Sequence, residues 1–230
     1  MTQNERWSQS ILSKLDPKFR HRWIVYTETL KSLISRKTVW VDCGAGKNGT
    51  VKALGNLAKK ATGVDVIEGD KYDENYVQAD IRNLPFEDNS VDLLTLRFVV
   101  EHFEKTDAYF KEINRVLKSG GKSVVLTTNV ISPLIFLPKL LMPYPLRHWV
   151  LTRLFKVEDE DIFPTYHAFN TERALSEPIL GLRLVDISYI SDLNYTRKWV
   201  FLVLLSFHLI TRLPGLSRFR TNILAVLEKQ

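Results

Sequence analysis

The spacing of apolar residues along the chain predicts helices and short buried strands over the first 130 residues. Residues 5–35 carry apolar side chains every three or four positions, which indicates two helices separated at Pro17. Short apolar runs then alternate with helical patterns, as is typical of parallel α/β sheets. The runs predict strands at 39–41, 61–67, 76–79, 91–96 and 122–128. Helices are predicted at 50–60 and 106–117, the second ending in a left-handed cap at Ser119-Gly-Gly.

Past residue 130 the pattern becomes more apolar and less regular. Residues 131–150 are interrupted by four prolines, so they cannot form one long helix. Asn170 or Thr171 is suited to cap a helix that begins near Glu172. Two further strands are predicted at 182–190 and 222–227, paired antiparallel, with an apolar helix at 198–213 between them.

The stretch VWVDCGAGKNG at residues 39–49 has the order strand, glycine turn, helix that opens nucleotide-binding α/β folds. Glycine at positions 44, 46 and 49 permits positive φ and a close approach of the backbone to a ligand. The spacing matches a dinucleotide site, with Asp65 at the distance expected for a ribose partner. Asp42, however, places a carboxylate beside the turn, which suits a cationic sulfonium cofactor better than a pyrophosphate. The turn alone favours S-adenosylmethionine (SAM) over NAD and leaves both open.

Five segments follow one another in a characteristic order between residues 38 and 130: VDCGAG, GVD, QADIRNLPFEDNSVDLL, EHF and EINRVLKSGGKSVVLTTN. Together they resemble the class I SAM-dependent methyltransferases of the small-molecule type. The resemblance implies an α/β fold with a doubly wound, Rossmann-like seven-stranded sheet in the class I methyltransferase order. In one departure, Asn48 stands where the family has a third glycine, and Gly49 comes one position late. Asn tolerates left-handed backbone, so the turn can survive.

The resemblance also implies a single methyltransferase domain, 1–230, with additions to the minimal fold. Residues 1–37 are expected to form a helical N-terminal cap and residues 38–130 the SAM-binding core. Residues 131–170 occupy the place of a substrate or lid insertion, and residues 171–230 supply the C-terminal helix and strands. The apolar helix at 198–213 is a second insertion, between the sixth and seventh strands.

By resemblance, the SAM site is built at the ends of the first four strands. A carboxylate at the position of Asp65 is suited to accept both hydroxyl groups of the ribose. Asp80 is placed to accept the exocyclic amine of the adenine, and Ile81 to pack on the ring. The expected cofactor-binding residues are Asp42, Gly44, Ala45, Gly46, Asp65, Val66, Asp80, Ile81 and Arg97.

Methyl transfer to a hydroxyl benefits from a general base, for which there are three candidates. His102 follows the fourth strand, but the family carries the Glu-His pair in enzymes with different acceptors, so a structural or cofactor-shaping role is favoured. Tyr166 and His167 lie in a segment that could close over the acceptor. No cluster of His, Cys and carboxylates has metal-ligand spacing, so no metal is expected. The acidic run 158–161 is interpreted as a solvated loop.

Composition and charge narrow the expected partners. The net charge of +6 is too small to indicate nucleic acid, but it suits an anionic membrane surface or substrate. A single cysteine, Cys43, excludes an internal disulfide framework, and the N-terminus lacks the apolar core of a signal peptide. We therefore expect a cytoplasmic protein. The apolar stretches 131–150 and 198–213 are flanked by Arg and Lys, which predicts either a peripheral membrane contact or burial against one another or a partner subunit.

The expected activity is methyl transfer from SAM to a small acceptor. An oxygen of a glycan, of a lipid-linked compound or of another apolar metabolite is preferred over a nitrogen or carbon. A second hypothesis is a non-catalytic SAM-binding or interaction protein of the same fold, because no base is evident and Asn48 alters the turn. An NAD-dependent dehydrogenase is a distant third.

Overall fold

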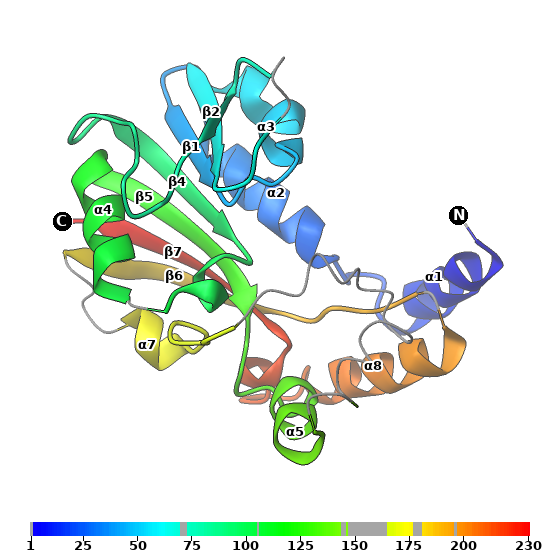
Figure 1. The fold of residues 1–230 in the computed structure, drawn as a ribbon. Helices are drawn as coiled ribbons and strands as arrows, with labels where there is room; N and C mark the ends of the chain where they lie inside the picture. The colour runs from blue at the N-terminus through cyan, green and yellow to red at the C-terminus, as the bar shows by residue number, and fades with distance from the viewer. Residues whose placement is uncertain are drawn as a thin grey trace. The chain divides into compact units, whose positions relative to one another are not determined.

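The computed structural model describes residues 2–69, 73–104, 106–143, 146, 165–176, 181–195 and 197–230 of the 230-residue chain (Figure 1). Contacts divide the chain into two compact units. Unit 1 comprises residues 1–25, 129–164 and 189–222, and unit 2 comprises residues 26–128, 165–188 and 223–230. The single-domain organisation stays a prediction. Residues 144–145 and 147–164 of the expected lid insertion, including the acidic run 158–161, lie outside the described residues.

Seven strands form one sheet in the order β3-β2-β1-β4-β5-β7-β6. Strands β1 to β5 pair in parallel. β7 runs antiparallel to β6, because the N–H of Gln230, just after β7, donates to the carbonyl of Gly181, just before β6 (3.0 Å). The strands are β1 (Val39–Cys43), β2 (Lys60–Asp65), β3 (Tyr76–Gln78), β4 (Val91–Arg97), β5 (Leu117–Thr128), β6 (Leu182–Ile190) and β7 (Asn222–Lys229). This topology confirms the predicted fold class.

The central strands form because their side chains are apolar on both faces. Trp40 and Val41 of β1 have no exposed surface, and Leu94 and Leu96 of β4 are equally buried. Continuous apolar runs of this kind are typical of parallel strands that are covered on both sides. The polar atom of Trp40 is satisfied, because its indole N–H donates to Thr95 Oγ1 over 2.9 Å.

The helices α2 (Arg22–Leu33), α3 (Gly49–Leu54), α4 (Thr106–Val116) and α7 (Glu172–Ser176) belong wholly or mostly to unit 2. α3 is shorter than the helix predicted at 50–60. It passes into a 3-10 turn, η1 (Gly55–Leu57), because Gly55 and Asn56 are poor helix formers. The N–H groups of Lys59 and Lys60 then donate to the carbonyl of Thr38, which leads the chain into β2.

The chain passes from α4 to β5 without the predicted glycine cap. α4 ends at Val116, and β5 begins at the next residue. Val91 pairs with Leu117 but Leu93 pairs with Lys122, so β5 bulges between these two positions. The left-handed Gly120 (φ 74°) lies in this irregular stretch. The prediction of a helix cap at Ser119-Gly-Gly is therefore wrong, because pairing with β4 starts directly after α4.

The helices described over their whole length in unit 1 are three, beside the first residues of α2. These helices are α1 (Gln3–Leu15), α5 (Pro133–Leu141) and α8 (Lys198–Ile210). Its core is formed by Leu12, Leu193, Phe201 and Leu205, and Trp7 packs edge to face on Phe201 with 5.9 Å between ring centroids. In the part of the chain that the structure describes, every helix is too short or too polar to cross a bilayer.

A buried polar link joins three segments of unit 1 around His208 of α8. The Nε2 atom of His208 lies 2.9 Å from Asp16 Oδ2, and its Nδ1 atom lies 2.9 Å from Ser191 Oγ. Burial lowers the pKa of His208, so the ring is neutral at physiological pH. A neutral ring donates from Nε2 to the Asp16 carboxylate and accepts the Ser191 hydroxyl at Nδ1. The link thereby fixes the end of α1 and the segment after β6 against α8.

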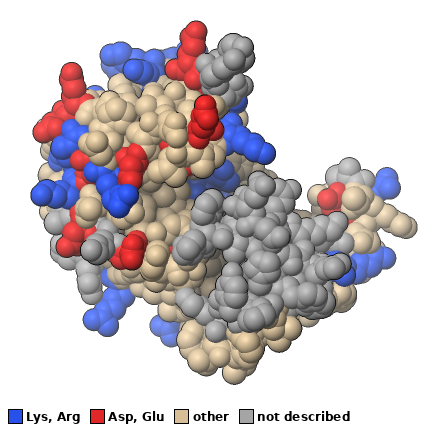
Figure 2. Space-filling model, in the orientation of Figure 1, with Lys and Arg blue, Asp and Glu red and all other residues tan. Residues whose placement is uncertain are grey.

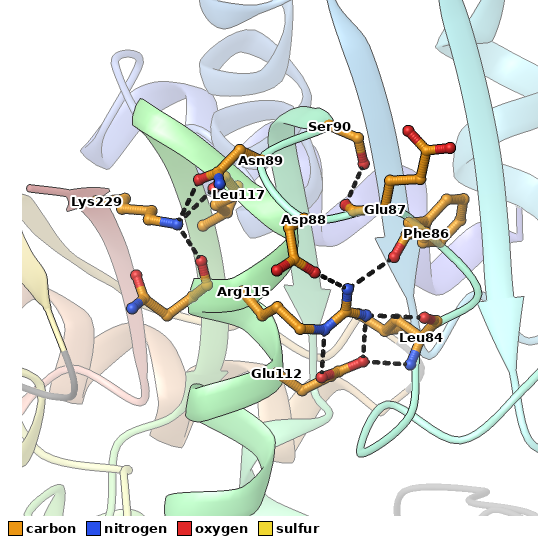
Figure 3. A network of polar contacts seen from close by, with 11 residues as sticks. Leu84, Phe86, Glu87, Asp88, Asn89, Ser90, Glu112, Arg115, Leu117 and Lys229 are labelled. Carbon is orange, nitrogen blue, oxygen red and sulfur yellow. Dashed lines mark hydrogen bonds and ion pairs between the residues drawn. The ribbon is translucent and has the colours of Figure 1, made fainter.

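Arg115 of α4 holds the loop that precedes β4 (Figure 3). Its guanidinium donates to Asp88 Oδ1 (2.6 Å) and to the carbonyls of Phe86 (2.9 Å) and Leu84 (3.1 Å). Glu112, one turn earlier, accepts two further bonds from the guanidinium (2.9 and 2.7 Å) and the N–H of Leu84 (2.7 Å). The bond from Arg115 is the main reason that the pKa of Glu112 is lowered. Residues 84–90 are therefore positioned by α4.

Removing the Arg115 side chain should detach this loop. We expect Arg115→Ala to lower the free energy of unfolding by about 2 kcal/mol, because several charge-assisted hydrogen bonds are lost at one position. Lys111→Ala, on the exposed side of the same helix, should change the free energy of unfolding by less than about 0.5 kcal/mol. Urea denaturation at neutral pH measures both values. Equal stability of the two variants would show that other contacts hold the loop.

Candidate functional site

The candidate site lies where the chain leaves β1, at the point where the strand order reverses. β1 lies between β2 and β4, so the chain continues to one side through β2 and β3 and later to the other through β4 and β5. Ligands of open α/β sheets bind beyond the carboxyl ends of the strands at such a reversal. The turn after β1 contains two left-handed glycines, Gly44 (φ 72°) and Gly46 (φ 53°). A Cβ atom on Gly44 would overlap the side chain of Val99, so only glycine fits there.

Asn48 keeps the turn intact although it replaces a glycine. Its φ of 58° is left-handed, and it stands directly before α3. Its buried side chain donates from Nδ2 to Asp73 Oδ2 (2.9 Å) and to the carbonyl of Asn75 (3.1 Å). This bond is the main reason that the pKa of Asp73 is lowered. The amide ties the turn to the segment before β3, which a glycine could not do. Asp73 is a site residue that sequence reasoning missed.

Asp65, at the end of β2, lies beside the turn. Its Oδ2 atom accepts the N–H of Gly46 (2.8 Å), and its Oδ1 atom accepts the N–H of Val66 (2.7 Å). Oδ1 also accepts the N–H of Ile67 (3.3 Å). A carboxylate has about four acceptor positions, so Oδ2 can still accept a hydrogen bond from a hydroxyl. Asp65 is half-buried, and Val66 beside it is exposed. A Cβ atom on Gly46 would meet nothing within 4 Å, so the turn also leaves room for a ligand here. These residues fit a ribose-bearing cofactor.

Asp42 is a buried carboxylate rather than one that faces solvent. It is 3% exposed and accepts a hydrogen bond from Thr95 Oγ1 over 2.5 Å. Burial raises the pKa of Asp42 to about 6, although the Thr95 bond and the positive charge of Arg97 act in the opposite direction. Ala45, on the turn that follows, is buried as well. The site therefore holds an anion at neutral pH that is costly to keep in the protein.

Asp80 and Ile81 follow β3. Arg82 engages the Asp80 carboxylate through Nε (3.0 Å to each oxygen) and Nη2 (2.5 Å), and these bonds lower the pKa of Asp80. Ile81 is buried, as expected of a residue that packs inside the fold. An adenine amine would have to share Asp80 with Arg82. The adenine role of both residues stays a prediction.

The segment after β4 carries backbone strain. Phe98 has a left-handed φ of 57°, which is rare for a bulky residue and costs roughly 1–3 kcal/mol. Its N–H donates to the carbonyl of Leu126 (2.7 Å), which holds the segment against β5. Asn48 and His167 are also left-handed. Three of the four non-glycine residues with positive φ in the described ranges thus belong to the candidate site or its candidate base. Such strain is concentrated at functional sites in proteins.

Glu101 links the candidate catalytic residues to β5. It lies in a 3-10 turn, η2 (Val100–His102), and accepts hydrogen bonds from the hydroxyls of Thr127 (2.6 Å) and Thr128 (3.3 Å). Burial raises the pKa of Glu101. Its carbonyl oxygen accepts the N–H groups of Tyr166 (2.8 Å) and His167 (3.2 Å). The structure therefore brings His102 near the Tyr166-His167 segment, because Glu101, the neighbour of His102, binds the backbone of that segment.

Asn170 completes this network and was only partly anticipated. Its Nδ2 atom donates to Thr127 Oγ1 (2.6 Å) and to the carbonyl of Thr128 (2.9 Å), and the side chain is fully buried. The prediction that Asn170 or Thr171 caps the next helix is confirmed for Thr171, whose Oγ1 accepts the N–H of Ala174 (3.1 Å). The partners of Asn170 instead lie about forty positions away in the chain.

The three candidate bases keep the status of predictions. Tyr166 is half exposed, and His102 is only partly buried. No side-chain contact of His102, Tyr166 or His167 singles one of them out as the base. Among the residues that the structure describes, no three His, Cys, Asp or Glu side chains gather as a metal site would require.

Gly63 of β2 is needed to make room for Asn48. A Cβ atom at this position would overlap the amide oxygen of Asn48 and approach Ala45 Cβ to 2.9 Å. We expect Gly63→Ala to lower the free energy of unfolding by about 1–3 kcal/mol, through overpacking against the turn. Gly49→Ala is the matched control, since a Cβ there would meet nothing within 4 Å. Thermal or urea denaturation distinguishes them, and a tolerated Gly63→Ala would mean that Asn48 can move aside.

Asp42 should make stability depend on pH. Its pKa in the folded protein, about 6, exceeds the unfolded value of about 4, so the folded state binds more protons between these values and stability falls as pH rises. The variant Asp42→Asn has no carboxyl group to ionise at this position, so it does not lose this stability as pH rises. Its free energy of unfolding relative to the natural chain should therefore increase by about 2 kcal/mol between about pH 4 and pH 7. Urea denaturation of both proteins across this range is the measurement, and a difference that stays constant would contradict it.

Comparisons with known proteins agree with this geometry. Residues 41–125 match the family described as methyltransferase domain. Ubiquinone/menaquinone biosynthesis C-methyltransferases UbiE from Shewanella sp. (strain ANA-3) and Shewanella baltica (strain OS155) are 46% identical to this chain over 52 residues. The match covers 23% of this chain and 21% of each relative, so it spans about a fifth of the length of these curated relatives.

Solved structures share the fold over most of the chain. The putative methyltransferase of Haloferax volcanii, solved with the Trm112 methyltransferase activator, has a TM-score of 0.57 at 17% identity and covers 100% of this chain and 98% of its own. Geranyl diphosphate C-methyltransferase from Streptomyces coelicolor A3(2), solved with S-adenosyl-L-homocysteine (SAH), has a TM-score of 0.54 at 14% identity, covering 100% and 84%. The chain therefore shares the fold of these methyltransferases, and its residues 41–125 match the methyltransferase domain.

Proposed function

We propose that this protein transfers a methyl group from SAM to a small acceptor, with an oxygen of a glycan, of a lipid-linked compound or of another apolar metabolite as the preferred site. The observation that carries the proposal is the arrangement of Asp65 against the turn. Its carboxylate is fixed by the N–H groups of Gly46, Val66 and Ile67, and the remaining acceptor position on Oδ2 is suited to a ribose hydroxyl. The methyltransferase domain match over residues 41–125 supports the same cofactor.

Bound SAM supplies a methyl carbon that is already activated by the sulfonium, so the protein has to align the acceptor and exclude water. Asp65 would hold the ribose, and the left-handed Gly44 and Gly46 let the backbone approach the cofactor. Asp42, ionised above about pH 6, supplies negative charge beneath the turn for a cationic ligand. The positive charge of Arg97, at the end of β4, lowers the pKa of Asp42 and offsets part of its negative charge.

A hydroxyl acceptor has to lose its proton during transfer. His102, Tyr166 and His167 are the residues that could take it, and the carbonyl of Glu101 fixes the backbone of the last two. His167 is the first of the three to test, because its left-handed backbone (φ 55°) is held by that contact. His102 is assigned the shaping of the cofactor site. Asp42 and Glu101 are buried and already accept hydrogen bonds from threonine hydroxyls, so we assign them positioning roles.

Transfer to carbon is the second candidate. The UbiE proteins and geranyl diphosphate C-methyltransferase are C-methyltransferases by name, and both are similar to this chain. A carbon acceptor that is nucleophilic by itself needs less help from a base, which suits a site where no base is singled out. A SAM-binding protein without turnover is the remaining alternative of the same fold.

Cofactor binding can be tested by calorimetric titration of the full chain with SAM and SAH, with NAD as the control. We expect micromolar binding of SAM and SAH and none of NAD. Asp65→Asn should weaken both at least tenfold, because one acceptor oxygen becomes an amide donor. Asp186→Asn, an exposed carboxylate of β6, should bind like the natural chain. Folded protein that binds neither ligand, or binds NAD, would overturn the proposal.

Turnover then separates the enzyme from the binding protein. The full chain is incubated with SAM and with lipid or glycan extracts, and SAH is measured. SAH formation that depends on the extract and disappears in Asp65→Asn supports transfer. SAM binding without SAH formation in any extract would favour the non-catalytic alternative.

A further inference from the structure

α8 of unit 1 presents an apolar face to its surroundings. Trp199, Leu202, Val203 and Ile210 of this helix, together with Leu213 just after it, are 45–57% exposed. Their spacing follows the helical period, so they share one side of α8. The opposite side packs inward through the buried Val200, Phe201, Leu205 and His208. The helix is therefore apolar on the side that faces its own core and also on the side that does not.

The exposed side of α8 has no polar group that requires water. Ser206 is its one polar member, and its hydroxyl donates to the carbonyl of Leu202 over 2.9 Å. A helix that bonds its own hydroxyl in this way can be transferred to an apolar medium at little cost. α5 of the same unit adds Phe136, Leu137, Leu140 and Leu141, which are 46–71% exposed. We call these nine exposed apolar residues of α5 and α8 the apolar face.

The charge of unit 1 favours a negatively charged partner for the apolar face. Its described residues include eleven Lys and Arg against three Asp and Glu, whereas those of unit 2 include sixteen against seventeen. Over its full sequence, unit 1 has fourteen Lys and Arg against seven Asp and Glu. The three acidic residues in its described part are engaged. Glu5 closes the capping box of α1, Asp16 accepts from His208, and Asp192 pairs with Arg22 (2.8 Å). Unit 1 thus carries a net positive charge, and the part of its surface that is seen at the bottom of Figure 2, where α5 lies, is mostly uncharged.

We propose that the apolar face docks this protein on a lipid bilayer that contains anionic headgroups. α8, with 13 residues, is about 20 Å long and cannot cross a bilayer, so it would lie in the plane of the interface. Exposed basic residues stand at both of its ends, with Arg197 and Lys198 at the start and Arg212 and Arg218 beyond the last turn. Apolar insertion and attraction to anionic lipids act together in such helices.

A second copy of the chain is a poorer occupant for the same face. Two copies of unit 1 would bring surfaces of like charge together, which opposes association. An anionic bilayer instead complements the basic residues while it removes the apolar side chains from water. The inference goes beyond the proposed function, because it concerns unit 1 and requires no bound SAM.

Docking can be measured on the full chain without cofactor. The substitution Val203→Cys provides a site for an environment-sensitive dye, and the native Cys43 is fully buried and so protected in the folded protein. Vesicles of pure phosphatidylcholine are compared with vesicles that contain roughly a third phosphatidylglycerol. We expect a blue shift of the dye with the anionic vesicles only, reduced at high salt. The same dye on Val185→Cys, an exposed valine of β6 in unit 2, should not respond.

Sedimentation with the same vesicles supplies the matched variants. Val203→Asp should lower the bound fraction at least tenfold, because it places a charge in the apolar side, whereas Val185→Asp should not change it. Folding of each variant is checked by circular dichroism. No binding of the folded natural chain at low salt would overturn the proposal. So would a concentration-dependent dimer that Val203→Asp abolishes, since a second copy would then cover the face. Titration of the same sample with SAM shows separately whether the cofactor site works, so a failure of docking is not confused with a failure of SAM binding.

Discussion

The carboxylate of Asp65 joins two strand ends, and the geometry of the candidate site depends on this contact. One oxygen accepts an N–H from the turn after β1, and the other accepts an N–H from the chain just after β2. The contact is possible because β1 and β2 are adjacent and parallel, with Cys43 paired to Val64, so both strands end at the same edge of the sheet. Parallel pairing thus places a carboxylate and a glycine turn side by side although 19 positions separate them in the chain.

The fold was predictable because its signals are local. Strands apolar on both faces, such as β1 and β4, indicate a buried parallel sheet without knowledge of their neighbours. The error at β5 arises from distant pairing, because β5 starts early where β4 is available to pair with it. α3 instead ends early for a local reason, since Gly55 and Asn56 are poor helix formers. Helix ends are generally the least certain part of such predictions.

The residues of the candidate site also differ in whether their roles follow from local sequence or from distant contacts. Asp65 and the left-handed turn followed from spacing and residue type, and the tolerance of Asn48 for positive φ followed from its chemistry. Asp73, which Asn48 binds across 25 positions, and Asn170, which binds Thr127 across 43, left no periodic signal. Both are polar residues that a local analysis assigns to turns or caps. Their roles depend on which segments the sheet brings together.

Costly features are concentrated at the edge of the sheet where β1 and β4 end. Asp42 is kept in the core with a raised pKa, and Phe98 is held in a left-handed conformation. Neither feature helps the fold, because a neutral residue or a relaxed backbone would be more stable in each place. Locally unfavourable choices of this kind are expected where a sequence is selected for binding or chemistry. The energetic pattern therefore indicates the same edge of the sheet as the topology does, and by independent reasoning.

Both insertions are attached to the carboxyl ends of sheet strands. The segment after β5 starts at Asn129, whose buried side chain donates to the carbonyls of Arg218 (2.8 Å) and Arg220 (2.7 Å) at the end of the segment between β6 and β7. One amide thus fastens the start of the first insertion to the end of the second. The two insertions carry the apolar face, and the segment between β6 and β7 has five Lys and Arg against one Asp. Unit 2, which carries the turn of the candidate site, is nearly neutral in its described part. Partner choice can therefore change through the insertions while the cofactor site stays the same, because no residue of the turn contributes to the apolar face.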